Sequence, residues 1–339
     1  MNIQQAIAAV LDNQDLARDE MHAVMQQIMT GEATPAQIGG FLIGLRMKGE
    51  TVAEITAAAQ VMRELSSKVA VNADSLVDTC GTGGDASGSF NISTASAIVA
   101  AAAGAKVAKH GNRSVSSKSG SADVLEAAGV NLNLSADQVA ASVEQCGVGF
   151  MFAPNHHSAM KHAIGPRKEM GVRTIFNVLG PLTNPAGAPN QVMGVFDAKL
   201  CRPIAEVLQA LGSRHVMVVR SDDGMDEISI AAPTQVAELK GGVITEYTLQ
   251  PEDFGLQRSS LDYIKVETAA DSLAMIQLLL EGKEGAAADI VALNAGAAIY
   301  VSGNADSLAA GVAKAQTVLS SGAAKAKLAE LVEISKAQG

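Results

Sequence analysis

Residues 78–85 read Asp-Thr-Cys-Gly-Thr-Gly-Gly-Asp, and a second polar run, Asn-Ile-Ser-Thr, follows at residues 91–94. The first run joins an apolar, strand-like segment to an alanine-rich segment, expected to be a helix over 93–103. Glycine lets a backbone approach a ligand and turn its N–H groups inward, and a helix N-terminus adds partial positive charge. The spacing therefore predicts an anion-binding loop. Asp85 would not suit a bare phosphate, so the ligand should also offer hydroxyl groups or a divalent cation.

Two familiar phosphate-binding motifs do not fit this loop. A Walker loop ends in Gly-Lys-Ser/Thr, but no lysine follows these glycines before Lys106. A dinucleotide fingerprint needs G-x-G-x-x-G; Gly81 and Gly83 match, but Ala86 stands at the last position, which only some variants tolerate. Taken alone, one such loop is equally compatible with a tight strand-to-helix turn that binds nothing.

A second polar loop follows the next expected strand. Residues 109–120 read Lys-His-Gly-Asn-Arg-Ser-Val-Ser-Ser-Lys-Ser-Gly, and a helix is expected to begin near Ser121. A solvated basic loop would explain the cations but not the many small hydroxyl side chains between them. These suit a phosphate cradle, with Arg113 and the lysines as counter-charges. Because loops after successive parallel strands meet at the carboxyl edge of one sheet, both loops are expected at one site.

Four carboxylates crowd residues 221–227, which read Ser-Asp-Asp-Gly-Met-Asp-Glu and follow an apolar, strand-like segment. Such carboxylates repel one another unless solvent or a cation screens them. Mg²⁺ often binds through one or two carboxylates plus substrate phosphates. An acidic turn in a hairpin is the alternative, because Asp and Gly are ordinary turn residues. Beside two phosphate-suited loops, a magnesium site is the better interpretation.

Three histidines and an arginine mark a further segment. His156, His157 and His162 lack the i, i+4 spacing and the cysteine or acidic partner of a zinc site, so we exclude zinc. Pro166 is expected to break or begin a helix, which would leave Arg167 at a bend where its guanidinium could meet a carboxylate. The alternative is an ordinary surface arginine near a kink.

Several of these motifs, in this order, resemble those of the anthranilate phosphoribosyltransferase family. They are residues 78–85, Phe-Asn-Ile-Ser-Thr at 90–94, 109–117, Asp226-Glu227, Arg-Thr-Ile-Phe-Asn-Val-Leu-Gly-Pro-Leu-Thr-Asn-Pro at 173–185 and Asn-Ala-Gly-Ala-Ala at 294–298. The resemblance covers nearly the whole chain. Ala86, Ser89 and Ser158 depart from the usual pattern, but Ser89 keeps a hydroxyl and Ala86 is small.

The resemblance implies transfer of phosphoribosyl from 5-phosphoribosyl 1-diphosphate to the amine of anthranilate, on the way to tryptophan. By motif, the donor-binding residues are Gly81, Gly84, Asp85, Ser89, Asn91, Ile92, Ser93, Thr94, Lys109, His110, Gly111, Asn112, Arg113, Ser114, Val115, Ser116, Ser117 and Ser121. The residues implied to bind anthranilate are Gly81, Asn112, His156 and Arg167, with Arg167 facing the carboxylate, and those implied to hold Mg²⁺ are Ser93, Asp226 and Glu227. No catalytic base is obvious: His110, Asn112 or a water could accept the amine proton.

The expected fold is α/β, with a small all-helical domain and a larger domain around a mainly parallel central sheet, as in nucleoside phosphorylases and phosphoribosyltransferases. Thr34 before Pro35, and Thr51 with Glu54, predict two helix starts within a helical region that extends to about residue 70. The predicted strands are 76–79, 106–109, 149–151, 192–195 and 216–219, with a hairpin of 235–240 and 243–249.

Residues 158–184 are expected to be helical again. By resemblance they rejoin the first helices, so that 1–70 with about 158–185 form the helical domain, which forms the dimer surface and the acceptor side. Residues 73–157 and 186–339 then form the donor-binding α/β domain, and the active site lies in a cleft that closes by a hinge.

Composition limits the partners and the compartment. The net charge of -10 argues against nucleic acid, which needs a basic face. The 3 cysteines are scattered without metal spacing, and an odd number suits a reducing cytoplasm. The first residues do not form a signal peptide, and no apolar run is long enough to span a bilayer. A cytoplasmic protein that acts on small molecules, away from membranes, is therefore expected, and the resemblance implies that it is a homodimer.

Two other functions stay open at this point. A pyrimidine nucleoside phosphorylase shares the architecture and a glycine-rich loop but attacks with free phosphate. Residues 91–94 with Asp226-Glu227 favour a diphosphate donor with a metal instead. A non-catalytic relative that binds a nucleotide or a partner would be expected to carry substituted loops, and the loops here are intact.

Overall fold

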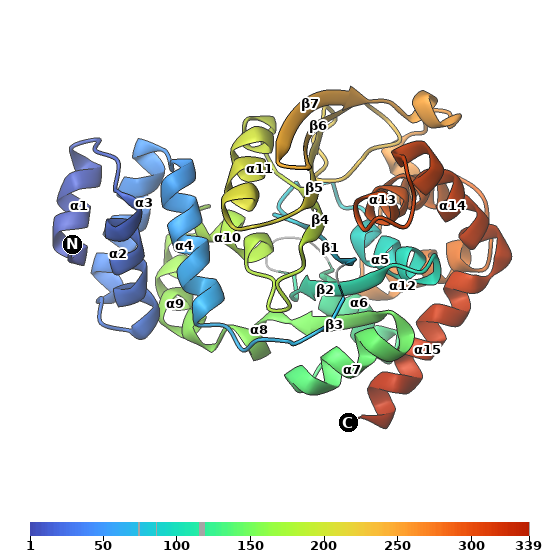
Figure 1. Ribbon diagram of the computed structural model, residues 1–339, viewed down its shortest axis with the longest axis horizontal. Helices are drawn as coiled ribbons and strands as arrows, with labels where there is room; N and C mark the ends of the chain where they lie inside the picture. Colours follow the sequence, from blue (N-terminus) through green and yellow to red (C-terminus); the bar gives the residue numbers. More distant parts are fainter. Residues whose placement is uncertain (74, 86, 115–118, 339) are drawn as a thin grey trace.

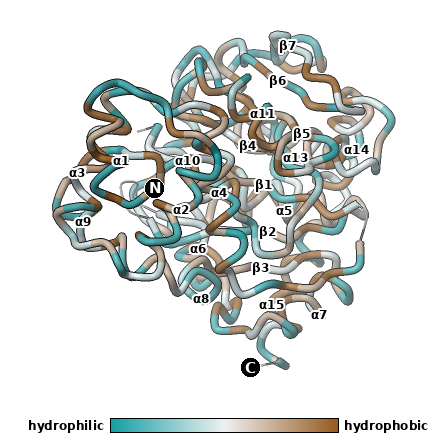
Figure 2. Tube along the Cα trace, turned by 60° about the vertical axis from the view of Figure 1, so that its left-hand side comes forward, coloured by the Kyte–Doolittle hydropathy of each residue, from teal (hydrophilic) through white to brown (hydrophobic). Residues whose placement is uncertain are grey.

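The chain forms a group of helices at its N-terminal end and a larger region built on a sheet (Figure 1). The structure is a computed structural model and describes residues 1–73, 75–85, 87–114 and 119–338. The strands and the helices against them are largely hydrophobic, whereas many peripheral loops are hydrophilic (Figure 2). Among the described residues, no helix is long and apolar enough to cross a membrane.

Within residues 1–73 the structure has four helices, α1 (Ile3–Leu11), α2 (Arg18–Thr30), α3 (Pro35–Lys48) and α4 (Val52–Glu64). The two predicted helix starts are confirmed. The Thr34 hydroxyl accepts the backbone N–H of Gln37 over 3.3 Å, with Pro35 at the first helical position. The Thr51 hydroxyl accepts the N–H of Glu54 over 3.2 Å. Each bond satisfies an N–H group that the helix itself leaves unpaired.

In the described part of the chain, seven strands form one sheet in the order β3-β2-β1-β4-β5-β6-β7. Their bounds are β1 (Leu76–Gly81), β2 (Lys106–Gly111), β3 (Val148–Phe152), β4 (Asn190–Gly194), β5 (His215–Ser221), β6 (Thr234–Lys240) and β7 (Val243–Leu249). The first five are parallel, and β6 and β7 add an antiparallel hairpin. The predicted, mainly parallel sheet and its hairpin are confirmed, with strand ends shifted by one or two residues.

Helices cover both faces of the sheet. Val77 packs in a cluster with α5 (Ile92–Ala102) and α13 (Ala286–Val301), whereas its neighbour Leu76 packs with α7 (Ala136–Cys146). Consecutive side chains of a strand point to opposite faces, so both faces of β1 are buried. Further helices of the described chain are α6 (Ser121–Ala127), α8 (Ala153–His156), α11 (Cys201–Ala210), α12 (Ala269–Leu280), α14 (Leu308–Ser321), α15 (Ala323–Ala337), η2 (Ala198–Leu200), η3 (Pro251–Phe254) and η4 (Leu261–Ile264).

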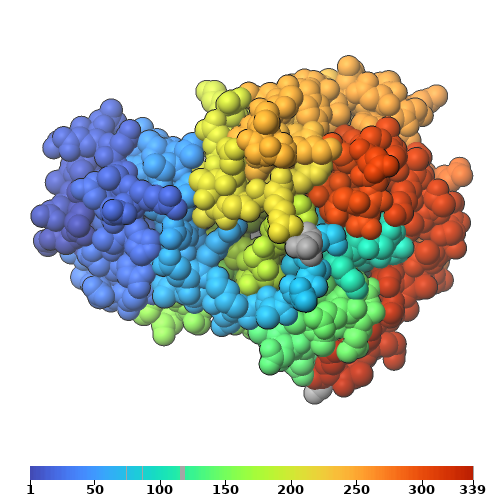
Figure 3. Space-filling view, in the orientation of Figure 1, coloured from blue at the N-terminus to red at the C-terminus, as the bar shows by residue number. Residues whose placement is uncertain are grey.

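The segment after β3 returns to the N-terminal helices. It contains η1 (Ser158–Met160), α9 (Lys161–Met170) and α10 (Phe176–Leu182); α9 packs on α2 and α3, and α10 packs on α4. The expected helix break at Pro166 is wrong, because Pro166 is buried inside α9 and the helix continues to Met170. Tertiary packing of this buried turn outweighs the lost backbone hydrogen bond. The surface between the blue helices and the sheet region is hollowed, with yellow-green atoms at its floor (Figure 3).

Candidate active site

The glycine-rich loop after β1 lies against the acidic turn after β5. The N–H of Gly83 donates to Oδ2 of Asp226 over 2.7 Å. A Cβ atom at Gly81 would lie 2.4 Å from the same oxygen, and one at Gly194 would lie 1.5 Å from the Asp226 carbonyl oxygen. Gly81 and Gly194 are register partners on β1 and β4. Glycine is therefore required here to admit Asp226, in addition to any approach of a ligand.

Asp85 lies close enough to Asp226 and Glu227 for its charge to act on both of these carboxylates. Burial, with a smaller effect of Asp85, raises the pKa of Asp226 to about 6. Burial followed by the charge of Asp226 raises the pKa of Glu227 well above its usual range. No three His, Cys, Asp or Glu side chains in the described residues are arranged to hold a metal ion unaided. The set fits Mg²⁺ that also binds substrate phosphates.

Ser93, in the first turn of α5, lies beside Glu227. Its backbone forms a hydrogen bond to the Glu227 carboxylate, and its hydroxyl accepts a bond from Lys109 Nζ over 3.2 Å. The structure thus brings the predicted metal set, Ser93, Asp226 and Glu227, to one place. The buried hydroxyl of Thr94, the next residue, has no hydrogen-bond partner among the described residues. It is a polar atom available to a ligand.

Lys109 extends into the protein instead of into the second loop. The side chain is buried, and Nζ also donates to the carbonyl oxygen of Thr79. Burial lowers the pKa of Lys109, and the carboxylates of Asp78 and Glu227 oppose that effect. Lys109 therefore supplies positive charge from within the sheet, between two buried acids.

Asp78 and Asn184 join three segments beneath the loops. Asp78 accepts from the His110 N–H over 3.1 Å and from Asn184 Nδ2 over 2.8 Å. The same amide nitrogen donates to the Ala108 carbonyl oxygen over 2.9 Å. Sequence reasoning gave Asn184 no role, although it lies in one of the family motifs.

Two of the three clustered imidazoles are held neutral. The rings of His110 and His157 lie 5.0 Å apart, and His156 Nδ1 lies 3.0 Å from the Ser67 carbonyl oxygen. Burial, with smaller effects of the neighbouring histidines, lowers the pKa of His110 to about 3 and that of His157 to about 4. Among the described residues, the Nε2 atoms of His110, His156 and His157 have no hydrogen-bond partner.

Asn91 links the two loops. Its Nδ2 donates to the Ser119 carbonyl oxygen over 3.3 Å, and its Oδ1 accepts from the Ser119 and Ser272 hydroxyls over 3.0 and 2.8 Å. Asn91 is the residue that precedes α5, but its side chain makes no capping bond to that helix. Its Oδ1 atom accepts the two serine hydroxyls instead. Ser89, near the start of this polar stretch, lies 3.0 Å from the Ser87 hydroxyl.

Ion pairs and hydrogen bonds hold the described part of the second loop against the start of α6. Arg113 pairs with Asp123 over 2.9 Å and with Glu126 over 2.7 Å, and it lies over the Phe152 ring. The Ser121 hydroxyl donates to the carbonyl oxygen of exposed Asn112 over 3.3 Å. Asp123 also accepts the N–H of Ser114 over 3.1 Å, and Gly111 leaves room for the Ser121 hydroxyl. The predicted donor residues Val115, Ser116 and Ser117, with Lys118, lie outside the described residues.

Arg167 is a half-buried cation without an acidic partner in the described part of the chain. Its guanidinium lies 5.1 Å from the centre of the Phe176 ring, and burial lowers its pKa. A half-buried guanidinium without a carboxylate partner favours an anionic ligand with a planar carboxylate.

Arg173 was missed by sequence reasoning as a site residue. It donates to the Gly84 carbonyl oxygen and lies 4.4 Å from the centre of the Phe196 ring. Its own carbonyl oxygen accepts from Arg46 of α3 over 2.5 Å. Arg173 thus connects the N-terminal helices to the glycine-rich loop. Its place in the 173–185 motif was the available signal.

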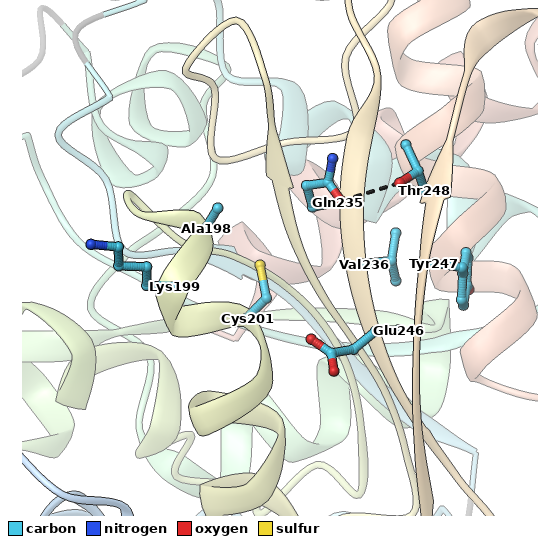
Figure 4. Close-up of a pocket in the computed structure, with 8 residues that line it drawn as sticks. All are labelled: Ala198, Lys199, Cys201, Gln235, Val236, Glu246, Tyr247 and Thr248. Carbon is cyan, nitrogen blue, oxygen red and sulfur yellow. Dashed lines mark hydrogen bonds between the residues drawn. The ribbon is translucent and has the colours of Figure 1, made fainter.

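A separate hollow lies between η2, α11 and the β6–β7 hairpin (Figure 4). Its lining residues are Ala198, Lys199, Cys201, Gln235, Val236, Glu246, Tyr247 and Thr248. None of them belongs to the loops after β1 and β2 or to the acidic turn. Burial raises the pKa of Cys201 to about 11, so the thiol stays protonated and unreactive.

Comparison with known proteins first defines the class. The chain matches the helical bundle domain of a glycosyl transferase family over residues 4–66 and the a/b domain of that family over residues 73–325. The helical group and the sheet region correspond to these two matches.

More similar relatives define the particular family. An anthranilate phosphoribosyltransferase of Thioalkalivibrio sulfidiphilus is 68% identical over 332 residues, 98% of either chain. One of Marinomonas sp. is 67% identical over 338 residues, 99% of this chain and 98% of the relative. The crystal structure of the Thermus thermophilus enzyme has a TM-score of 0.93 at 43% identity, covering 98% of this chain and 99% of that one. This chain belongs to the anthranilate phosphoribosyltransferase family.

A more distant solved structure shares the fold. The Saccharomyces cerevisiae anthranilate phosphoribosyltransferase in complex with PRPP and Mg has a TM-score of 0.90 at 24% identity, covering 99% of this chain and 98% of that one.

Proposed function

We infer that this chain is a pentosyltransferase of tryptophan biosynthesis. It transfers the phosphoribosyl group of 5-phosphoribosyl 1-diphosphate to the amine of anthranilate, giving N-(5-phosphoribosyl)anthranilate and diphosphate. The observation that carries this conclusion is the meeting of the β1 loop with a buried acidic turn, Gly83 to Asp226, in a chain of this family. A site with polar loops and paired acids suits a diphosphate donor better than the free phosphate of a nucleoside phosphorylase.

The donor is assigned to the two loops after β1 and β2. The glycines at 81–84, the start of α5 and the second loop would hold its phosphates and hydroxyls. Support comes from the unpartnered Thr94 hydroxyl at the start of α5 and from Lys109, whose charge lies beside Ser93. A helix N-terminus and a buried cation both favour an anion at this point.

Magnesium is assigned to Ser93, Asp226 and Glu227. Burial, and then the charge of a neighbouring carboxylate, raises the pKa of both acids, and a divalent cation held by them would offset the cost of their charges. The yeast relative, solved with PRPP and Mg, has the same fold. When bound, magnesium would neutralise charge on the leaving diphosphate.

The reaction exchanges one bond at the anomeric carbon for another. The bond from this carbon to the diphosphate oxygen breaks, the bond to the anthranilate nitrogen forms, and the nitrogen loses a proton. Positive charge develops on the ribose and negative charge on the diphosphate, so fixed N–H groups and Lys109 stabilise the transition state. The aromatic amine is a weak nucleophile, so its orientation matters more than strong base catalysis. Neutral His110 and Asn112 are the side chains proposed to contact the amine or its proton.

Anthranilate is assigned to Arg167, His156, Asn112 and Gly81. The main support comes from Arg167, which is half-buried, stacked on Phe176 and unpaired with any described acid. Its fork would face the anthranilate carboxylate and fix the ring for attack.

The domain division and the dimer are part of this proposal. Residues 1–70 with about 158–185 would move as one helical domain against the rest, and Arg46 with Arg173 would carry that motion to the donor loop. Leu11 and Met47 are 69% and 81% exposed on the neighbouring helices α1 and α3. Exposed apolar side chains on adjacent helices favour a homodimer interface there. The test is light scattering on the double variant Leu11→Glu, Met47→Glu, whose molar mass should be half that of the wild-type dimer.

The proposed compartment is the cytoplasm. Cys80, Cys146 and Cys201 are all free thiols, and two of them are buried. Free buried thiols are usual in a reducing compartment.

The decisive experiment follows anthranilate fluorescence with purified protein and 5-phosphoribosyl 1-diphosphate, with and without Mg²⁺. We expect a Mg²⁺-dependent loss of signal, and Arg167→Ala should raise the KM for anthranilate about tenfold or more. Arg258→Ala, which removes an exposed arginine paired with Glu252, is the control. Donor binding without turnover would contradict the assigned reaction.

A further inference from the structure

We propose that Asn294, a buried residue of α13, is a positioning residue for Asp226 and Glu227, because it fixes Ile228, the next residue along the chain. The proposal rests on the assignment of these two acids to the magnesium site. Asn294 is 2% exposed and is not assigned to bind a substrate or the metal.

The Asn294 amide pairs with both backbone groups of Ile228. Its Oδ1 accepts the Ile228 N–H over 2.9 Å, and its Nδ2 donates to the Ile228 carbonyl oxygen over 2.9 Å. The second hydrogen of Nδ2 serves the Ile290 carbonyl oxygen, also over 2.9 Å, one turn earlier in α13. A side chain that engages both groups of one residue fixes its position and its orientation. Breaking these bonds would leave buried backbone groups of Ile228 unpaired, at a cost in free energy, so the contact is expected to persist.

A second anchor holds the turn on the other side of the two acids. Asp223 accepts from the Ser221 and Ser229 hydroxyls, each over 2.5 Å, and from the Met225 N–H over 3.2 Å. Its carboxylate is therefore used within the turn and is not free for a metal. Asp226 and Glu227 lie between this local anchor and the one that Asn294 provides from a distant helix.

The helix that carries Asn294 is itself fixed by close packing. A Cβ atom at Gly296 would lie 2.6 Å from the Val312 backbone of α14, and one at Gly311 would lie 2.3 Å from the Gly296 carbonyl oxygen. Helices that approach this closely cannot slide past one another without a clash. α13 is therefore a fixed reference for the acidic turn.

The same helix also supports α5. α13 packs against α5 and against β1, β4 and β5, and α5 carries Ser93, whose backbone bonds to Glu227. The positions of Ser93 and of the two acids thus both depend on α13. Loss of the Asn294 bonds would leave Ser93 in place and release the acids, so the geometry of the metal set would change first.

A merely structural role would show as lost stability without a change in metal use. Ser302→Ala is the matched control: Ser302 is buried at the end of α13, and its hydroxyl donates to the Ile299 carbonyl oxygen over 2.9 Å and accepts from Asn304 over 3.0 Å. Within the described residues, its hydroxyl forms no hydrogen bond to a residue assigned to the reaction. Both variants should lower the Tm.

The test measures donor binding by titration calorimetry at a series of Mg²⁺ concentrations, without anthranilate, beside the Mg²⁺ dependence of turnover. For Asn294→Ala we expect the half-saturating Mg²⁺ concentration to rise about tenfold or more in both measurements, because small displacements at a site of this kind are costly. Ser302→Ala should match the wild type. Asn294→Ser, which keeps one hydrogen-bonding group, should lie between the two.

Three results separate the possibilities. Unchanged Mg²⁺ dependence in Asn294→Ala, with a Tm loss like that of Ser302→Ala, would overturn the positioning role. If Asn294→Ala does not fold, Asn294→Ser decides in the same way. A wild-type protein that binds the donor and turns over independently of Mg²⁺ would instead refute the metal assignment on which the inference depends.

Discussion

The backbone N–H of Gly83 donates to the Asp226 carboxylate over 2.7 Å, so the loop after β1 and the turn after β5 meet directly. Residues far apart in the chain thus define one site. The glycines of the first loop serve two purposes there: they expose N–H groups, and they leave space for the acid.

Gly81→Ala should impair the reaction through this contact. The added methyl group would lie 2.4 Å from Asp226 Oδ2, so the carboxylate must move. We expect kcat/KM to fall about tenfold or more, with a higher requirement for Mg²⁺. Gly39→Ala, where a Cβ atom would meet only an ordinary contact at 3.8 Å, should behave like the wild type in the same assay. Equal activity of the two variants would refute the steric argument.

Asp226→Asn should separate stability from activity. Burial and Asp85 raise the pKa of Asp226 to about 6, so at pH 7 without magnesium its charge costs the folded protein free energy relative to the unfolded chain. An amide keeps an acceptor for Gly83 and removes the charge. We expect a gain in stability on the order of 1 kcal/mol, measured by urea unfolding in EDTA, together with a large loss of Mg²⁺-dependent turnover. Asp262→Asn, on the surface, is the control, and a less stable Asp226→Asn would contradict the prediction.

Arg173→Lys should weaken the link between the helices and the donor loop. Lysine cannot reproduce both the stacking on Phe196 and the bond to the Gly84 carbonyl oxygen. The KM for 5-phosphoribosyl 1-diphosphate should rise by about threefold to tenfold, whereas the KM for anthranilate should change less. Steady-state kinetics with each substrate varied in turn provide the check. A selective effect on anthranilate would assign Arg173 to the other substrate.

Acid should destabilise the protein through its buried histidines. The folded-state pKa is about 3 for His110 and about 4 for His157, below the usual 6.5, so the unfolded chain binds more protons between these values. Their contribution to stability is complete above pH 6.5 and is lost as the pH falls towards 4 and 3. Buried acids with raised pKa values act in the opposite direction, so a difference between variants is needed.

His157→Asn isolates this effect. The urea midpoint of the wild type should fall more between pH 7.5 and pH 5 than that of the variant, because the variant lacks one of the two groups. Parallel midpoints over this range would show that His157 is not held neutral.

Regular local patterns made much of the fold predictable. Apolar runs such as 216–219 gave the parallel strands, and Gly241-Gly242 gave the hairpin turn, because these signals lie within a few neighbouring residues. The helix break predicted at Pro166 was wrong, because the packing of α9 outweighs the local preference of proline.

The residues of the candidate site were found as motifs, but their contacts could not be. Nothing near Gly81 in the sequence indicates Asp226, and nothing near Asn91 indicates Ser272. Such pairs depend on how distant elements pack, and a single sequence carries no pattern at that separation. Asn184, Arg173 and Asn294 lie in the motifs of the family, but their individual contacts could not be predicted for the same reason.

The position of β1 in the sheet has a consequence for synthesis on the ribosome. β1 lies between β2 and β4, so its second edge stays unpaired until residues 190–194 have emerged, and α5 gains its cover only with α13, Ala286–Val301. Contacts so distant in sequence form slowly and leave strand edges exposed to other chains. A nascent chain stopped before β4 therefore leaves one edge of β1 open to other chains, and one stopped before α13 still lacks the helix that packs on α5.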